Sequence, residues 1–240
     1  MGSAREFYNR GLDCYKQQDY ELAVKNFTEA IRLDWNFAEA FNCRGRAYAK
    51  LKKPQALRDF FKAVKLKPNF ANAYYNRGNA YNELGQYEKA IQDFNKVIEL
   101  KPQNSFAYKN RGVAYYCLKN YLQALMDFDR AIELNQNYAL AYCNRGLVYI
   151  ELKECEQAIQ DFNKAIELNS NEVDAYYNRG KCYESLGQYE RAIQDFDKAI
   201  TLKPNAHDLY FNRGVCYENL GEHEKARADF NKAEEFNLND

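Results

Sequence analysis

The amino-acid sequence predicts an all-α fold, a solenoid of seven antiparallel helix-turn-helix repeats. The first observation is a glycine that recurs every 34 residues, with one step of 33, at Gly11, Gly45, Gly78, Gly112, Gly146, Gly180 and Gly214. The second is that each repeat carries two apolar stripes with the period of a helix. A period in this range is typical of solenoids, because one repeat cannot bury its apolar face alone and has to stack on its neighbours.

The repeats begin at Ala4 and use up the rest of the 240-residue chain as a single domain, 4–240. Their ranges are 4–37, 38–70, 71–104, 105–138, 139–172, 173–206 and 207–240. We interpret the preceding Met1, Gly2 and Ser3 as a cloning remnant, which would mean that the domain was cut from a longer protein.

Each element of a repeat follows from its residue pattern. Repeat positions 4, 7, 8, 11 and 14 share one stripe of a first helix, and positions 20, 24, 27 and 28 share one stripe of a second. The small residues at positions 8 and 20 indicate that the two helices approach closely there, because glycine otherwise lowers helix stability.

Breakers stand where the helices should end. Gly85, Gly187 and Gly221 fall in the expected turn within a repeat, and Pro68, Pro102 and Pro204 fall between repeats. The residue that the second repeat lacks belongs to its inner turn, beside Pro54, where we expect a local kink and not a lost repeat.

These positions resemble the tetratricopeptide repeat over the entire chain. An aromatic residue holds position 4 in every copy, Ala holds position 20 from Ala23 to Ala226, and Phe holds position 24 from Phe27 to Phe230. The resemblance implies a right-handed superhelix whose first helices line a concave groove. In that family the groove receives an extended or helical peptide.

The net charge of the chain and its distribution limit the kind of partner that the chain could bind. Lys plus Arg and Asp plus Glu both total 34, so no net charge favours nucleic acid or an anionic membrane. The first two repeats nevertheless hold 14 basic and 8 acidic residues, whereas the last three hold 12 and 19. Neither an apolar run long enough for a membrane span nor a signal peptide is present, which predicts a cytoplasmic protein without membrane contact.

The chain offers no convincing catalytic or metal site. Its seven cysteines occupy mostly different repeat positions without a C-x-x-C pair, and His207 and His223 are the two histidines. A glycine-rich loop that could cradle a phosphate is also absent. The sequence therefore predicts a protein that is not an enzyme, with no metal, no cofactor and ordinary reduced cysteines.

The face of the first helix opposite the buried stripe varies most between the copies, and its chemistry is zoned. Repeats one and two supply basic residues and repeats five to seven acidic ones. Repeats four and five supply an apolar middle, namely Phe106, Val113, Tyr116, Leu140, Leu147 and Ile150. An exposed apolar cluster of this size usually marks a contact surface. The alternatives are that exposed positions simply drift and that neighbouring helices cover the cluster.

Position 6 supplies a second groove feature, an asparagine in six of the seven repeats: Asn9, Asn76, Asn110, Asn144, Asn178 and Asn212. A carboxamide both donates and accepts hydrogen bonds, so a row of them would suit an extended peptide backbone. The row resembles the asparagine ladder of some superhelical family members, although asparagine is also common at this position in the family.

Position 7 is Arg in every repeat, and position 23 is Asp in six of them, with Asn26 in the first. Position 7 points towards the helix-packing side, where an unpaired guanidinium would be costly. We therefore expect the two positions to pair within each repeat as part of the structure.

The function that these features favour is a scaffold that binds a protein or peptide ligand, not nucleic acid. The alternatives are self-assembly and a helical repeat that binds single-stranded RNA. Positions 21 and 28, apolar in six repeats, become Arg227 and Glu234 in the seventh, which predicts a capped end with no eighth repeat after it. Phe236 and Leu238 remain apolar and could support end-to-end pairing, so a weak homo-oligomer is an alternative to a monomer.

Overall fold

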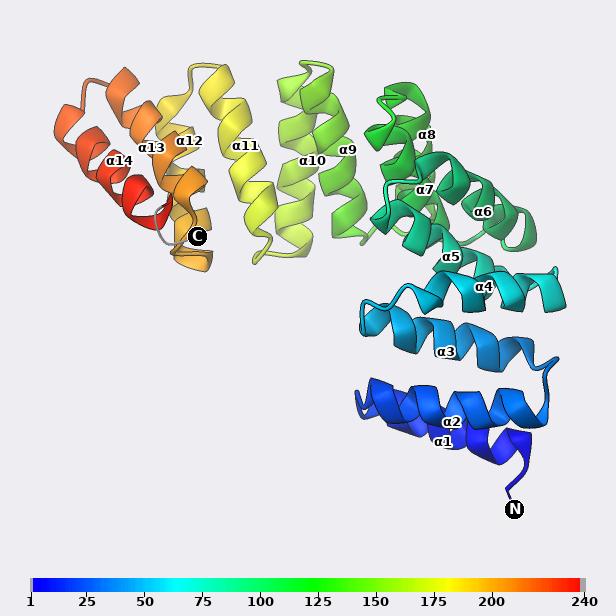
Figure 1. Cartoon of the computed structure of the whole chain (residues 1–240). Coiled ribbons are helices and arrows are strands. Elements are labelled where there is room, and N and C mark those ends of the chain that lie inside the picture. The colour runs from blue at the N-terminus through cyan, green and yellow to red at the C-terminus, as the bar shows by residue number, and fades with distance from the viewer. Residues whose placement is uncertain (1, 238–240) are drawn as a thin grey trace. The chain divides into compact units, whose positions relative to one another are not determined.

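The structure is a computed structural model that describes residues 2–237 and divides into two compact units, Met1–Asn120 and Tyr121–Asp240 (Figure 1). All regular structure in the described residues is α-helix, as predicted. The division falls in the inner turn of the fourth repeat.

The first unit holds the first three repeats and the first helix of the fourth. Its helices are α1 (Ala4–Lys16), α2 (Tyr20–Leu33), α3 (Ala38–Lys50), α4 (Gln55–Leu66), α5 (Ala71–Glu83), α6 (Tyr87–Leu100) and α7 (Ser105–Cys117). The Ser3 hydroxyl accepts a hydrogen bond from the Glu6 backbone N–H at 3.2 Å, and the Glu6 carboxylate accepts one from the Ser3 N–H at 3.1 Å. Ser3 thus caps the first helix.

The second unit holds the second helix of the fourth repeat and the last three repeats. Its helices are α8 (Tyr121–Leu134), α9 (Ala139–Glu151), α10 (Cys155–Leu168), α11 (Val173–Ser185), α12 (Tyr189–Leu202), α13 (His207–Asn219) and α14 (His223–Asn237). In both units the paired helices of a repeat pack together, and each second helix packs on the first helix of the next repeat.

The glycine at position 8 is explained by the phenylalanine at position 24. A methyl group at Gly146 would lie 2.8 Å from the Phe162 ring, and one at Gly11 would lie 2.6 Å from the Phe27 ring. Both rings are fully buried. The close approach is therefore between the backbone of the first helix and an aromatic ring of the second, and a side chain at position 8 would overfill the space.

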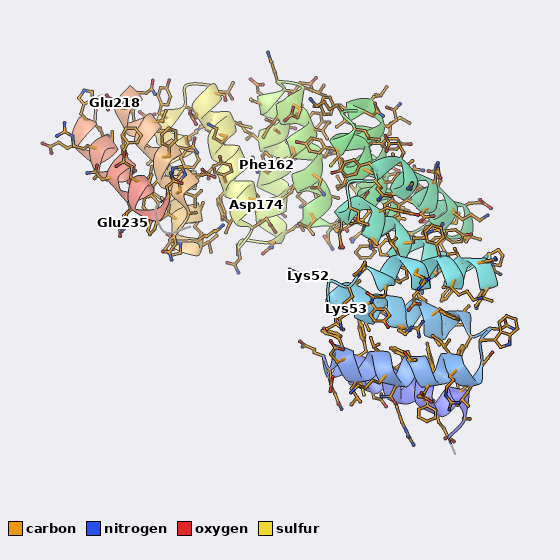
Figure 2. All side chains as sticks on the ribbon, in the orientation of Figure 1. Lys52, Lys53, Phe162, Asp174, Glu218 and Glu235 are labelled. Atoms are coloured by element: carbon orange, nitrogen blue, oxygen red, sulfur yellow. The ribbon has the colours of Figure 1, made fainter. Side chains whose placement is uncertain are left out.

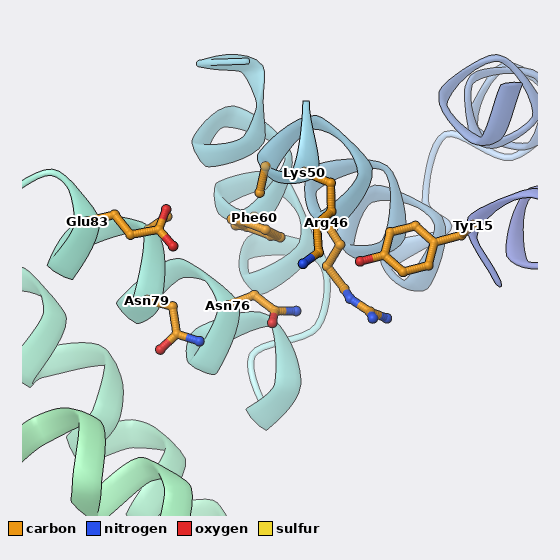
Figure 3. A pocket seen from close by; sticks show the side chains of 9 residues that line it. Tyr15, Arg46, Lys50, Phe60, Asn76, Asn79 and Glu83 are labelled. Atoms are coloured by element: carbon orange, nitrogen blue, oxygen red, sulfur yellow. The ribbon is translucent and has the colours of Figure 1, made fainter. Parts of the chain in front are cut away.

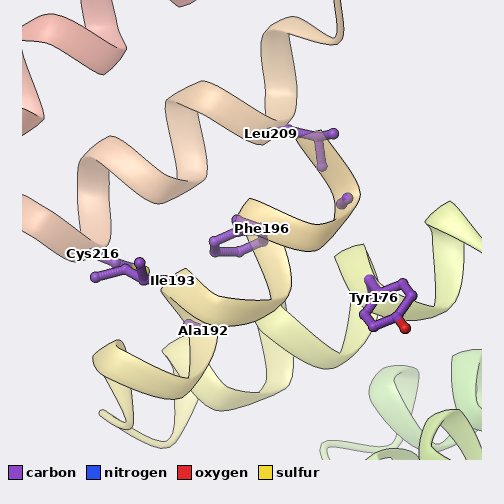
Figure 4. Close-up of a cluster of buried hydrophobic side chains, with 7 residues drawn as sticks. Tyr176, Ala192, Ile193, Phe196, Leu209 and Cys216 are labelled. Carbon is purple, nitrogen blue, oxygen red and sulfur yellow. The ribbon is translucent and has the colours of Figure 1, made fainter. Parts of the chain in front are cut away.

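Consecutive repeats share their cores. Figure 4 shows one such cluster, in which Phe196 and Ile193 of α12 lie between Tyr176 of α11 and Leu209 and Cys216 of α13. Because a second helix such as α12 is covered by the first helices of its own and of the next repeat, a single repeat taken from the array would lose the apolar contacts with its neighbours.

The inner turns confirm the predicted glycine breakers. Gly85, Gly187 and Gly221 all adopt left-handed backbone angles, with φ of 69°, 69° and 76°. The same position in the other four repeats is also left-handed although it is not glycine, at Gln18, Lys52, Lys119 and Lys153. Pro68, Pro102 and Pro204 lie in the turns between repeats, as expected.

The second repeat is retained despite its missing residue. Pro54 occupies the cap of α4, and this helix has 12 residues where the second helices of the first and third repeats have 14. The deletion therefore shortens the first turn of α4, while Ala56 and Phe60 keep their buried places.

Candidate functional site

The varying face of the first helices forms a hollow in the first unit. It has a volume of about 320 Å³ and lies along α1, α3 and α5 (Figure 3). Its lining includes Tyr15, Arg46, Lys50, Asn76, Asn79 and Glu83. These side chains occupy the face that the sequence predicts for the groove, so the first three repeats bring that face together as a concave surface.

The hollow is polar, and its cations Arg46 and Lys50 outnumber its carboxylate, Glu83. The Arg46 guanidinium lies over the Tyr15 ring, 4.7 Å from its centroid, which holds the cation at the rim. Neither Arg46 nor Lys50 forms an ion pair with a carboxylate within residues 2–237. The arrangement suits a ligand with carboxylates and hydrogen-bonding backbone groups.

The two units differ strongly in charge. The first unit holds 21 Lys and Arg against 12 Asp and Glu, a net charge of +9, and the second holds 13 against 22, a net charge of −9. Figure 2 labels examples from each, Lys52 and Lys53 in the first unit and Asp174, Glu218 and Glu235 in the second. The gradient predicted from the repeats is thus divided between the two units.

The apolar middle is only partly exposed. Phe106, Val113 and Tyr116 lie on α7 of the first unit, where Phe106 is 52% exposed and the other two are half-buried. Leu140, Leu147 and Ile150 lie on α9 of the second unit. Leu140 is 48% exposed, whereas Leu147 and Ile150 pack against the core around Phe162. Part of the predicted cluster therefore belongs to the helix packing.

Several of the asparagines at position 6 donate an amide hydrogen to another group of the chain. Asn76 donates to the Asn42 side chain at 2.8 Å, and Asn110 donates to the Asn79 side chain at 2.7 Å, so each links its own repeat to the preceding one. In the second unit Asn178 donates to the Asp174 carbonyl at 2.7 Å.

The other three asparagines differ in exposure. Asn9 is exposed, Asn144 is half-buried and Asn212 is buried, where it accepts a hydrogen bond from Lys181 at 3.0 Å. A ligand that used all six would therefore meet carboxamides with different exposure and different bonds, and not a uniform row.

The predicted pairing of positions 7 and 23 is confirmed in five repeats. Arg145 donates to both carboxylate oxygens of Asp161, at 2.8 and 2.6 Å, and the hydrogen bond to Asp161 raises the pKa of Arg145. The other pairs with the same two-pronged geometry are Arg44–Asp59, Arg77–Asp93, Arg179–Asp195 and Arg213–Asp229. The five Asp residues are buried. These pairs belong to the structure of each hairpin and not to a ligand site.

The position-7 arginines of the second to seventh repeats also contact the residue at position 25 of the preceding repeat, a contact that the sequence reasoning missed. Arg145 donates to Asp129 at 2.6 Å, and Arg77 lies over the Phe61 ring, 4.4 Å from its centroid. The remaining contacts are Arg44 with Thr28, Arg111 with Asn95, Arg179 with Asn163 and Arg213 with Asp197. The available signal was that position 25 holds a hydrogen-bond acceptor in every repeat except the second.

The cysteines show no sign of a metal or redox site. All seven are free, and the described residues hold no group of three or more His, Cys, Asp or Glu that could bind a metal ion. Burial raises the pKa of Cys143 and Cys216 to about 12, so both are protonated thiols at neutral pH. None of the helices in residues 2–237 is both long and apolar enough to cross a membrane.

Comparison with family models decides the family. A tetratricopeptide repeat model matches residues 71–104, 105–138, 173–206 and 207–240, with the boundaries predicted from the sequence. A second TPR repeat model matches residues 11–52, 54–85 and 146–187. The chain belongs to the tetratricopeptide repeat family.

Curated relatives match over a short stretch. Tetratricopeptide repeat protein 16 of Homo sapiens and that of Macaca fascicularis are each 40% identical to this chain over 47 residues. That stretch covers 20% of this chain and 5% of each relative, so the chain spans a small fraction of their length.

Solved structures match over much more of the chain. A tetratricopeptide repeat protein from Parabacteroides merdae has a TM-score of 0.76 at 26% identity and covers 97% of this chain and 93% of its own. The crystal structure of MamA has a TM-score of 0.64 at 29% identity and covers 68% of this chain and 95% of its own. YrrB, described as a TPR protein with an unusual peptide-binding site, has a TM-score of 0.62 at 26% identity and covers 74% and 91%.

Proposed function

We propose that this chain is a protein-interaction scaffold that binds a peptide segment of a partner on the face of its first helices. The hollow along α1, α3 and α5 is the observation that carries the proposal, because it displays carboxamides and the cations Arg46 and Lys50, neither of which forms an ion pair with a carboxylate among the described residues. The similarity to YrrB, a peptide-binding member of the same family, supports the same use of the surface here.

The charges suggest how the ligand would be oriented. Acidic ligand residues would face Arg46 and Lys50 in the first repeats, and basic residues would face Asp174 and Glu218 in the second unit. The exposed parts of Phe106 in the first unit and of Leu140 in the second unit each offer a contact for an apolar ligand side chain. The ligand is therefore a peptide with an acidic end, an apolar anchor and a basic end.

The test is selection of peptides from a random displayed library, followed by affinity measurements on variants. Replacing Tyr116 and Leu147 with Glu should abolish binding of the selected peptides, because a carboxylate would be forced against the apolar anchor. Leu122→Glu on α8 is the matched control, since Leu122 is 67% exposed and lies on a second helix.

Circular dichroism of the variants separates a lost site from a lost fold. If the selected peptides still bind when helicity is intact, the face of the first helices is not the site. Binding of a single-stranded RNA with a steep dependence on salt would instead contradict the assignment to a peptide ligand, because that dependence is produced by phosphate contacts.

A further inference from the structure

The outer face of α4 carries exposed aromatic and basic side chains that the hollow does not use. Trp35, in the turn before the second repeat, is 67% exposed, and Phe61 on α4 is 50% exposed. Arg58, Lys62 and Lys65 lie around them on the same helix. We call these five residues the basic aromatic surface.

The seven repeats serve as an internal comparison, and the second departs from the others here. Position 25 is Phe61 in the second repeat and polar elsewhere, at Thr28, Asn95, Asp129, Asn163, Asp197 and Asn231. Position 29 is basic in the first two repeats, as Arg32 and Lys65, whereas the third, fourth, fifth and seventh repeats have Glu there and the sixth has Thr201. The helix packing is maintained with polar or acidic residues at these positions, so it does not require the aromatic and basic ones.

The surface is also hollowed. A cavity of about 530 Å³ is lined by Arg58, Phe61, Lys62 and Lys65 together with Val64, Pro68 and Tyr74. Arg77, held by its pair with Asp93, supports the Phe61 ring from beneath at 4.4 Å. The aromatic wall therefore rests on a fixed guanidinium, which leaves an apolar recess rimmed by cations.

The positive charge of this surface is uncompensated. Asp59 is the single acidic residue of α4, and it is buried against Arg44. Among residues 2–237, the cations Arg58, Lys62 and Lys65 form no ion pair with a carboxylate. Three cations around an apolar recess are complementary to carboxylates that flank an apolar side chain.

We propose that the basic aromatic surface docks an acidic segment of a partner protein that inserts an apolar side chain into this recess. A protein segment suits the surface better than a nucleic acid does. The Lys62 ammonium already lies 5.6 Å from the Trp35 ring centroid and 5.9 Å from that of Phe41, so a cation occupies one face of Trp35 and a base could stack only on the other face. The recess between Val64, Pro68 and Tyr74 accepts a side chain without such a change.

Trp35 is the one tryptophan of the chain, so its fluorescence reports directly on this surface. The probe is a capped twelve-residue peptide of repeated Glu-Glu-Leu, and its matched control is the same length of repeated Glu-Glu-Gly. We expect the leucine peptide to shift Trp35 emission saturably and to bind at least tenfold more tightly than the glycine peptide.

Two variants connect the signal to the surface. Combined Arg58→Glu, Lys62→Glu and Lys65→Glu should weaken binding at least tenfold through charge repulsion. Phe61→Asn introduces the residue that the third and fifth repeats carry at this position, so the fold should be retained while the apolar wall is lost. Lys198→Glu, at the position of Lys62 in the sixth repeat, is the control and should leave binding unchanged.

Three outcomes would overturn the proposal. Equal affinity for the two peptides would show that the recess takes no side chain. Tighter binding of a twelve-nucleotide oligouridine, lost in the same variants, would assign the surface to RNA. Self-association without peptide that the same variants abolish would assign it to a second copy of the chain. Tyr116→Glu with Leu147→Glu should leave the Trp35 titration unaltered, which separates this surface from the peptide groove.

Discussion

At the scale of single residues, the arginine at position 7 connects three helices. Arg145 joins α9 to Asp161 of its own hairpin and to Asp129 of the repeat before. A guanidinium can do this because its donors point in several directions from one plane, which a lysine cannot reproduce. The stacking of repeats therefore depends on directed polar contacts as well as on apolar packing.

Arg145→Ala should lower the free energy of unfolding by about 3 kcal/mol, because it leaves the buried Asp161 carboxylate without its partner. Chemical denaturation of Arg145→Ala, Asp161→Ala and the double variant measures the coupling. Strictly additive effects would mean that the pair contributes no coupling. Asp129→Asn is the control and should cost less than about 1 kcal/mol, because Asp129 is largely exposed and asparagine can still accept the hydrogen bond.

Gly146→Ala should also be destabilising, although alanine is the better helix former by about 1 kcal/mol. The added methyl group would lie 2.8 Å from the buried Phe162 ring, and overpacking of this kind costs about 1 to 3 kcal/mol. Thermal unfolding of Gly146→Ala and of Gly146→Ala with Phe162→Leu tests the cause. If Gly146→Ala alone is as stable as the unchanged protein or more stable, the steric explanation is excluded.

At the scale of elements, the inner turns show one backbone shape reached with different residues. All seven need a left-handed residue between the two helices, and three repeats place glycine there. The other four accept strain at this position, since a side chain disfavours the left-handed region. The turn is thus determined by the geometry of the hairpin and not by the residue that occupies it.

Lys153→Gly should stabilise the second unit by about 1 kcal/mol, because glycine removes the cost of the left-handed conformation at φ 63°. The gain is reduced by the greater freedom of glycine in the unfolded chain. Equilibrium denaturation measures the change, and Gly187→Ala is the reverse experiment in the neighbouring repeat, expected to lose a similar amount. A neutral result in both would show that these turns are unstrained.

Sequence alone was sufficient for the helices, for the boundaries of four repeats and for the pairing of Arg145 with Asp161, because each leaves a signal that recurs in at least six repeats. It was less informative about the site, because exposure depends on neighbours that no single repeat contains. Leu147 and Ile150 have the spacing of a groove face, yet the core around Phe162 covers part of each. The amide hydrogens of Asn76 and Asn110 are likewise engaged by adjacent repeats.

At the scale of the whole molecule, both ends of the array present polar residues where interior repeats present small apolar ones. Position 3 is a fully buried alanine in the second to sixth repeats, namely Ala40, Ala73, Ala107, Ala141 and Ala175. In the first repeat this position is Glu6, which is exposed. At the other end Arg227 and Glu234 of α14 are exposed at positions that are apolar in the other six repeats.

We therefore expect the chain to be mostly monomeric in light scattering over a concentration series, because a charged end face cannot take the place of a neighbouring repeat without burying unpaired charge. Phe236, an apolar residue that could support end-to-end pairing, packs within its own repeat against Tyr210, with ring centroids 5.5 Å apart. Leu238, the other such residue, lies outside the described residues.

The light-scattering series is repeated at low and high salt, since the two units carry charges of +9 and −9 that attract one another between molecules at low ionic strength. Growth that vanishes on adding salt would come from those charges, whereas long oligomers that persist in high salt would show that the end faces are adhesive and contradict the capped ends.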